Sequence, residues 1–182
     1  MKKGFTLLET LIAIAIMTVA VGAAFGMAQK SFQFTYQVKN QATAYFLAAE
    51  GLELVRNMRD NTALTNSALD PNAQTGWLSN FTSYLGKGFD IDPISEEISD
   101  CSGGSINGLC QLYQVFDSGS SIYTWKNDSG NSPASTFYRS FNIACLPADC
   151  QPNDSGAEAV VTSTVVWPGN SVVLTETLTN WH

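Results

Sequence analysis

The chain has few ionisable side chains. Only 14% of its 182 residues are charged, and its single histidine is the last residue, His182. A Ser-His-Asp triad or a histidine-based metal site cannot be built from one terminal histidine. Carboxylates are plentiful, but no two of them stand out as an acid and a base. The sequence also has neither a phosphate-binding loop nor a G-x-G-x-x-G motif. We therefore expect a protein that is not an enzyme.

Positive charge is scarce in the body of the chain. From residue 61 onward, three cations face twelve carboxylates, so the net charge there is −9. Without a basic patch to neutralise phosphates, this region is not expected to bind nucleic acid. The basic residues Lys2 and Lys3 instead precede an apolar run. That bias predicts a cytoplasmic N-terminus and an exported body.

Cysteine is also scarce, and all four cysteines follow residue 100. They form two local pairs, Cys101/Cys110 and Cys145/Cys150, and each pair brackets turn-forming residues. Three connectivities are possible, and we expect the local pairing. Disulfides persist in oxidising compartments, which agrees with an exported body. Neither spacing is C-x-x-C and no histidine lies nearby, so the pattern does not favour zinc.

The first thirty residues carry the most distinctive pattern. Residues 10–29 contain no charge, which is about the length that crosses a bilayer as a helix. Glu9 lies at the edge of this run, where an acidic residue has a cost. A secretory signal peptide and an ordinary uncleaved membrane anchor are two interpretations. Neither of them requires the Gly4-Phe5 junction or the acid that follows it.

The stretch Gly4-Phe5-Thr6-Leu7-Leu8-Glu9 resembles the processing site of type IV pilins and type II secretion pseudopilins. The resemblance implies that a prepilin peptidase cuts after Gly4 and that Phe5 becomes the N-methylated first residue. It also implies that Glu9 pairs with the N-terminal amine of a neighbouring subunit during assembly. A buried charge is tolerated when it is paired, so such a contact would fix the register of the two chains.

The helix is expected to continue to about Asp60, because no proline occurs before Pro71. Beyond Lys30, apolar residues recur at spacings of three and four, which predicts one face that packs on a globular head. These residues are Val38, Ala42, Tyr45, Ala49, Leu52 and Val55. Gly22 and Gly26 form a G-x-x-x-G pair, which indicates close helix packing or simply the small residues common in membrane helices.

Residues 61–110 are rich in turn-forming residues, which predicts a loop-rich region with one short helix near 76–85. Five carboxylates cluster near its end. Oxygen-rich loops can bind Ca²⁺, but this spacing fits no defined calcium loop. We expect a solvated acidic face, with calcium as the alternative and no other cofactor. The cluster consists of Asp90, Asp92, Glu96, Glu97 and Asp100.

Five strand-like runs follow, at residues 111–117, 121–127, 136–145, 158–167 and 171–181. The first two and the last two are expected to form hairpins. The middle run is expected to be a core strand, apart from Arg139. The predicted fold class is α+β. A long N-terminal helix, in a lollipop-like pilin arrangement, packs on a four- to five-stranded antiparallel sheet.

We divide the chain into a leader (1–4), a transmembrane or filament-core helix (5–30), its amphipathic continuation (31–60) and a globular head with a variable loop and the sheet (61–182). The resemblance implies a minor structural subunit of a type IV pilus or type II secretion pseudopilus. Before assembly it would be a single-pass membrane protein. The implied partners are other pilin or pseudopilin subunits, the prepilin peptidase and an inner-membrane assembly platform.

A binding module at the pilus tip, either an adhesin or a DNA-uptake receptor, is the alternative function. An exposed aromatic cluster in the head would favour binding, whereas buried tryptophans would favour a structural head. The chain has four tryptophans, and their exposure or burial distinguishes a binding head from a structural head.

Overall fold

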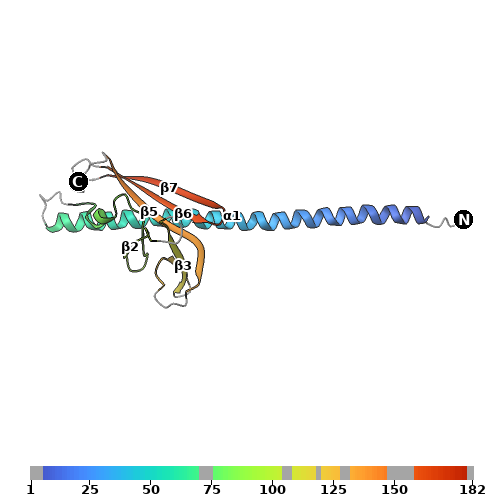
Figure 1. Cartoon of the computed structure of the whole chain (residues 1–182), viewed down its shortest axis with the longest axis horizontal. Coiled ribbons are helices and arrows are strands. Elements are labelled where there is room, and N and C mark those ends of the chain that lie inside the picture. Colours follow the sequence, from blue (N-terminus) through green and yellow to red (C-terminus); the bar gives the residue numbers. More distant parts are fainter. Residues whose placement is uncertain are drawn as a thin grey trace. The chain divides into compact units, whose positions relative to one another are not determined.

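The computed structural model describes residues 6–69, 76–103, 108–117, 120–127, 132–146 and 158–179. The chain divides into two compact units, Met1–Gln41 and Ala42–His182, and each is described by itself. Helix α1 begins in the first unit and is followed by a short 3-10 helix, η1, and seven strands (Figure 1). The elements are α1 (Leu7–Leu69), η1 (Ser79–Tyr84), β1 (Phe89–Ile91), β2 (Ile98–Asp100), β3 (Cys110–Asp117), β4 (Ser120–Thr124), β5 (Ala134–Leu146), β6 (Glu158–Trp167) and β7 (Asn170–Thr179).

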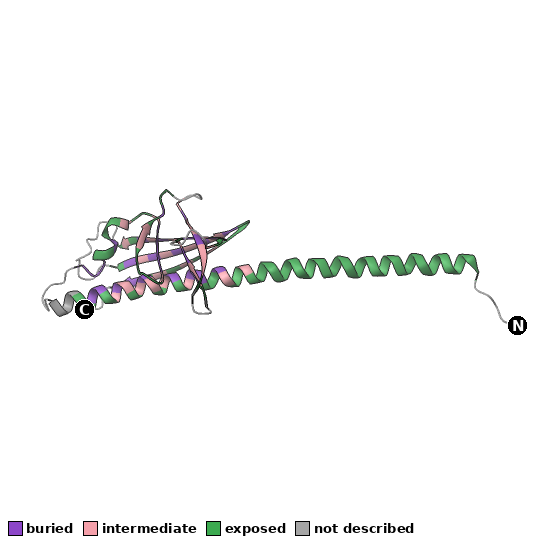
Figure 2. Ribbon diagram, turned by 90° about the horizontal axis from the view of Figure 1, so that it is seen from below, coloured by how far each residue is buried: buried purple, intermediate pink, exposed green. Residues whose placement is uncertain are grey.

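The first unit contributes only helix to the described structure. Leucine, alanine and methionine, which are strong helix formers, are frequent in this part of α1, and no proline interrupts it. All side chains from Thr6 to Lys39 are exposed (Figure 2). No side chain in this part of α1 is therefore buried within the described chain.

The second unit has two layers, the C-terminal part of α1 and an antiparallel sheet of seven strands. The long strand β5 lies at the centre. It pairs with β6 along one edge and with β3 and then β1 along the other. Strand β7 extends the sheet beyond β6, while β4 and β2 extend it beyond β3 and β1. Among the described strands, β7, β4 and β2 therefore form the edges.

The sequence predicted the class of this fold and five of its strands, which are β3 to β7. It missed β1 and β2, so the sheet has seven strands rather than four or five. Each missed strand has three residues, which is too short for a periodic pattern, and both lie in the region expected to be loops. The short helix expected near 76–85 is η1. Helix α1 continues to Leu69 instead of ending near Asp60.

The face of α1 that packs on the sheet matches the predicted face only in part, since Val55 and Leu52 pack in the core but the earlier predicted residues do not. Ala44, Ala48 and Gly51 are buried, whereas Val38 and Tyr45 are 46% and 53% exposed. Most of the circumference of α1 is apolar in this stretch, so spacing alone did not select the correct side. Small residues on the sheet side let the helix backbone approach the strands, and close packing then decides the orientation.

Two clusters of buried side chains join α1 to the sheet. The larger one surrounds Val55 and includes three phenylalanines with ring centroids 5.7 Å apart in successive pairs. The smaller one surrounds Ala44 and Ala48 and includes Trp167. The phenylalanines are Phe81, Phe89 and Phe141. The head is thus held by apolar burial along the whole second part of α1.

Gly51 lies where α1 packs tightly against Phe141 of β5, and its replacement makes a first prediction. A methyl group at Gly51 would lie 2.2 Å from Cε1 of the buried Phe141 ring. Alanine normally favours a helix over glycine by about 1 kcal/mol. We nevertheless expect Gly51→Ala to lower the free energy of unfolding of the head by about 1–3 kcal/mol, because overpacking outweighs that gain.

Denaturant unfolding of the full chain in detergent, followed by tryptophan fluorescence, measures this effect. Gly22→Ala is the matched control, since its methyl group would meet nothing within 4 Å. A head made more stable by Gly51→Ala would contradict the close packing described above.

Candidate functional site

Helix α1 starts at Thr6, whose spacing to Glu9 is that of a capping box. The backbone N–H of Glu9 donates to Oγ1 of Thr6 at 3.4 Å and to the Thr6 carbonyl at 3.0 Å. The T-x-x-E spacing is typical of a helix N-terminus. A carboxylate in the first turn is also stabilised by the positive end of the helix dipole. Glu9 therefore contributes locally to the start of the helix.

The side chain of Glu9 is exposed, and none of the residues that the structure describes forms an ion pair with its carboxylate. A long uncharged segment follows it directly. A carboxylate at the edge of such a segment requires a cation once the helix enters lipid or a bundle of apolar helices. The geometry thus leaves Glu9 available for a contact outside the described chain.

The segment after Glu9 presents large apolar side chains on every side of the helix. Leu11, Phe25 and Phe32 are 58%, 68% and 77% exposed. Within the described residues, α1 is the one helix long and apolar enough to cross a membrane. An apolar surface of this extent marks contact with lipid or with other proteins.

The apolar surface of α1 continues into the second unit. On the side of the helix away from the sheet, Tyr45 and Phe46 are 53% and 71% exposed, and their rings meet edge to face with centroids 6.2 Å apart. After the uncharged segment, the charged residues of this part of α1 are Lys30, Lys39, Glu50 and Glu53. The side that sequence analysis assigned to the head is therefore partly an outer surface (Figure 2).

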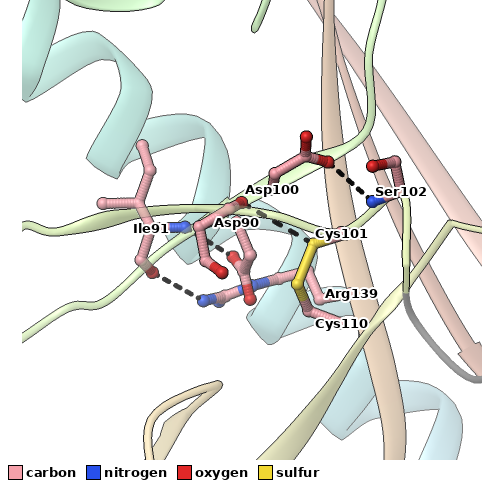
Figure 3. Close-up of a disulfide and its surroundings, with 8 residues drawn as sticks. Asp90, Ile91, Asp100, Cys101, Ser102, Cys110 and Arg139 are labelled. Atoms are coloured by element: carbon pink, nitrogen blue, oxygen red, sulfur yellow. Dashed lines mark hydrogen bonds and ion pairs between the residues drawn. A yellow bond between two sulfur atoms is a disulfide. The ribbon is translucent and has the colours of Figure 1, made fainter.

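The other predicted site residues have different outcomes. Gly4, Phe5 and Cys150 lie outside the described residues. Cys101 and Cys110 form a disulfide with a Cα–Cα distance of 5.0 Å, which joins the end of β2 to the start of β3 (Figure 3). Cys145 is also disulfide-bonded.

The predicted acidic face is wrong for two of its five members, Asp90 and Asp92, which are 0% and 2% exposed. The side chain of Asp92 accepts hydrogen bonds from the Thr124 hydroxyl at 2.6 Å and from the backbone N–H groups of Ile94 and Ser95 at 2.7 and 2.9 Å. Burial pushes the pKa of Asp92 upward, but these hydrogen bonds bring that pKa below its ordinary value. Asp92 thus holds the loop between β1 and β2.

The acidic residues do not converge on a common point. Glu96, Glu97 and Asp100 are exposed, whereas Asp90 faces the core. Within the described part of the chain, no three histidine, cysteine, aspartate or glutamate side chains are placed to hold a metal ion.

Arg139 is the residue that sequence analysis excluded from the core, and it is completely buried there. Its Nε donates to Oδ1 of Asp90 at 2.9 Å, and its Nη2 donates to the Ile91 carbonyl at 3.3 Å. Its Nη1 reaches α1, where it donates to the Leu47 carbonyl at 3.3 Å and to Oε2 of Glu50 at 3.4 Å. One guanidinium thus joins β5, β1 and α1, and Figure 3 shows how it lies against Asp90 and Ile91 of β1.

Burial raises the pKa of Asp90 to about 6, because the loss of hydration outweighs the opposing effect of Arg139. Strand alternation places Arg139 on the inward side of β5, but it does not identify the partner of Arg139. Phe137, Arg139, Phe141 and Ile143 share the inward side of β5, and all four are buried. An arginine at such a position requires a buried acceptor, and Asp90 is the carboxylate that supplies one.

Residues 1–25 match the family model described as the prokaryotic N-terminal methylation motif. This motif marks type IV pilin-like and pseudopilin proteins. The chain has the N-terminus of a type IV pilin-like protein. The motif and the apolar start of α1 together support a membrane-anchored pilin-like chain, and the motif implies processing by a prepilin peptidase and assembly with pilin subunits. Neither a curated protein nor a solved structure matches it.

Proposed function

We propose that this pilin-like chain is a minor structural subunit of a type IV pilus or of a type II secretion pseudopilus, and that it is not an enzyme. The observation that carries the proposal is the series of large exposed apolar side chains on α1 from Leu11 to Phe46, a stretch in which the only charged residues are Lys30 and Lys39. A surface of this length has no partner within the described chain, and the helices of neighbouring subunits would cover it.

In this proposal the N-terminus enters the membrane from the cytoplasm and the acidic body is exported. The peptidase cuts after Gly4, which creates a free amine on Phe5 that is then methylated. In the membrane, Glu9 lies near the headgroups. In the filament it pairs with the Phe5 amine of a neighbouring subunit, so the uncharged helix enters the bundle without an unpaired charge. An inner-membrane assembly platform draws the subunit from lipid into the filament.

The state of the tryptophans supports a structural head over a tip-binding module. Trp77 and Trp167 are only 3% and 6% exposed, and both belong to the core clusters. Trp125 is half-buried, and Trp181 lies outside the described residues. The described tryptophans therefore form no exposed aromatic platform for a ligand.

The mature N-terminus makes a second prediction. Mass spectrometry of the chain purified from a host with an active prepilin peptidase should find a first residue Phe5 that carries a methyl group. Gly4→Val, which puts a bulky residue at the cut, should retain Met1. A chain that begins after about residue 24, as expected for a secretory signal peptide, would contradict the proposal.

A further inference from the structure

Strand β7 is a long edge of the sheet. It spans Asn170–Thr179 and, among the described strands, pairs only with β6 (Figure 1). Its even-numbered side chains from Val172 to Leu178 lie toward α1, whereas its odd-numbered side chains are exposed. An edge strand presents backbone N–H and C=O groups that another strand can bind.

The register of the hairpin shows which backbone groups of β7 are open. Strands β6 and β7 are joined by the two-residue turn Pro168-Gly169, and Trp167 pairs with Asn170. In a two-residue hairpin the closing pair is hydrogen-bonded, so even-numbered residues of β7 bond to β6 and odd-numbered residues point outward. One contact confirms this parity, because Nη1 of Arg59 reaches the outward carbonyl of Thr179 at 2.7 Å.

Strand β7 has few of the features that protect edge strands, and they are the inward-facing Glu176 and the contact of Arg59 with the Thr179 carbonyl. It contains no proline, lysine or arginine, and all ten of its residues pair in unbroken register with β6. Its one charged residue, Glu176, lies on the α1 side and forms an ion pair with Arg56. The open positions are uncharged and rich in β-branched side chains, which favour strand pairing. They are Ser171, Val173, Thr175 and Thr177.

We propose that this edge binds the β7 strand of a second copy of the chain, in antiparallel orientation across a two-fold axis at Leu174. In this register Ser171 lies opposite Thr177 of the other copy, and Val173 lies opposite Thr175. All four open positions then bond on both chains, and no like charges meet. Arg59 selects this register, because it already occupies the carbonyl of Thr179.

The orientation of α1 separates this contact from the assembly of a filament. Arg56 contacts Glu176 and Arg59 contacts Thr179, so α1 and β7 run in the same direction within the head. Antiparallel β7 strands therefore bring together heads whose α1 segments run in opposite directions. Subunits that assemble from one membrane share a direction. The proposed contact thus joins copies of opposite orientation, and it does not rest on the proposed function.

A charge-swap experiment tests the pairing, because each copy places residue 173 opposite residue 175 of the other. In Val173→Lys/Thr175→Lys, two pairs of lysines would face each other across the axis. In Val173→Lys/Thr175→Glu, each lysine would face a glutamate. Both variants change only exposed side chains, so the head should fold in each. Thermal unfolding of each variant checks that expectation.

Sedimentation of the full chain in detergent, over a range of concentrations, is the measurement. We expect reversible association of the wild type, at least a tenfold weaker association of the Lys/Lys variant, and recovery in the Lys/Glu variant. Association through α1 contributes equally to all three chains and cancels. A wild type that does not associate, or two double variants that behave alike, would overturn the proposal and leave the edge to a strand of another protein.

Discussion

A Glu9→Ala variant should enter the membrane normally but be almost absent from filaments. Removing the carboxylate makes the helix more apolar, so membrane insertion does not suffer. In the filament, however, the amine of a neighbouring Phe5 would be buried without a partner. Loss of one member of a buried pair costs about 3–5 kcal/mol. Because about 1.4 kcal/mol corresponds to a tenfold change in an equilibrium, incorporation into filaments should fall more than tenfold. The ratio of sheared filaments to membrane fraction, in a host that assembles the chain, measures the effect.

Glu9→Gln separates the two roles of this residue. Glutamine also completes a capping box at the third helical position, so it preserves the start of α1 at Thr6. It carries no charge and cannot neutralise an amine. We expect Glu9→Gln to fail in assembly as Glu9→Ala does. If Glu9→Gln instead restored filaments, the capping box would be the function of Glu9 and the pairing role would be wrong.

A matched control comes from the exposed charge further along the same helix. Glu53 forms an ion pair with Arg56 on the outside of α1, and its side chain is 66% exposed. Surface pairs of this kind contribute about 0–1 kcal/mol. Glu53→Ala should therefore assemble close to the wild-type level. Equal loss of assembly in Glu53→Ala and Glu9→Ala would indicate a general effect of helix charge.

The start of the chain was the part most fully predicted from sequence, and the physical reason is locality. Fewer than ten residues carry the Gly4-to-Glu9 pattern, and the uncharged run behind it depends only on composition. The last hairpin was also predicted, because both of its strands are long and a Pro-Gly turn joins them.

The parts that escaped prediction depend on contacts between distant segments. Asp90 and Arg139 are 49 residues apart, and neither strand reveals by itself that it carries half of a buried pair. The three-residue strand β1 forms because β5 and β2 flank it. The orientation of α1 is decided by where small side chains meet the sheet at Gly51. A helix that is apolar on most sides does not encode that choice in its spacing.

Arg139→Met should be the most damaging single change in the head. Methionine is similar in length and fills the site, but it leaves the carboxylate of Asp90 buried without its cation. Such a change costs about 3–5 kcal/mol of unfolding free energy at neutral pH. Asp90→Asn should cost less, because asparagine still offers Arg139 an acceptor oxygen and carries no charge to desolvate. The double variant should be more stable than Arg139→Met alone.

The free energy of unfolding should depend on pH through Asp90, in a direction that a simple loss of packing would not produce. The pKa of Asp90 is raised from 3.8 to about 6 in the folded head, so the folded state binds a proton more readily than the unfolded chain. The stability contributed by this group is fully present below about pH 4 and is lost as pH rises through about 6. The wild type should therefore gain stability relative to Asp90→Asn as pH falls through this window, on the order of 3 kcal/mol.

The difference in unfolding free energy between the wild type and Asp90→Asn isolates Asp90. Asp92 acts in the opposite direction, because its lowered pKa makes it stabilising at higher pH, but it contributes equally to both chains. Arg139→Met should lose least at low pH, where Asp90 becomes neutral and no longer requires a cation. Chemical denaturation at several pH values between 4 and 7 tests both statements. A penalty for Arg139→Met that does not change with pH would mean that the guanidinium stabilises the head through its bonds to the Leu47 and Ile91 carbonyls and not through the charge of Asp90.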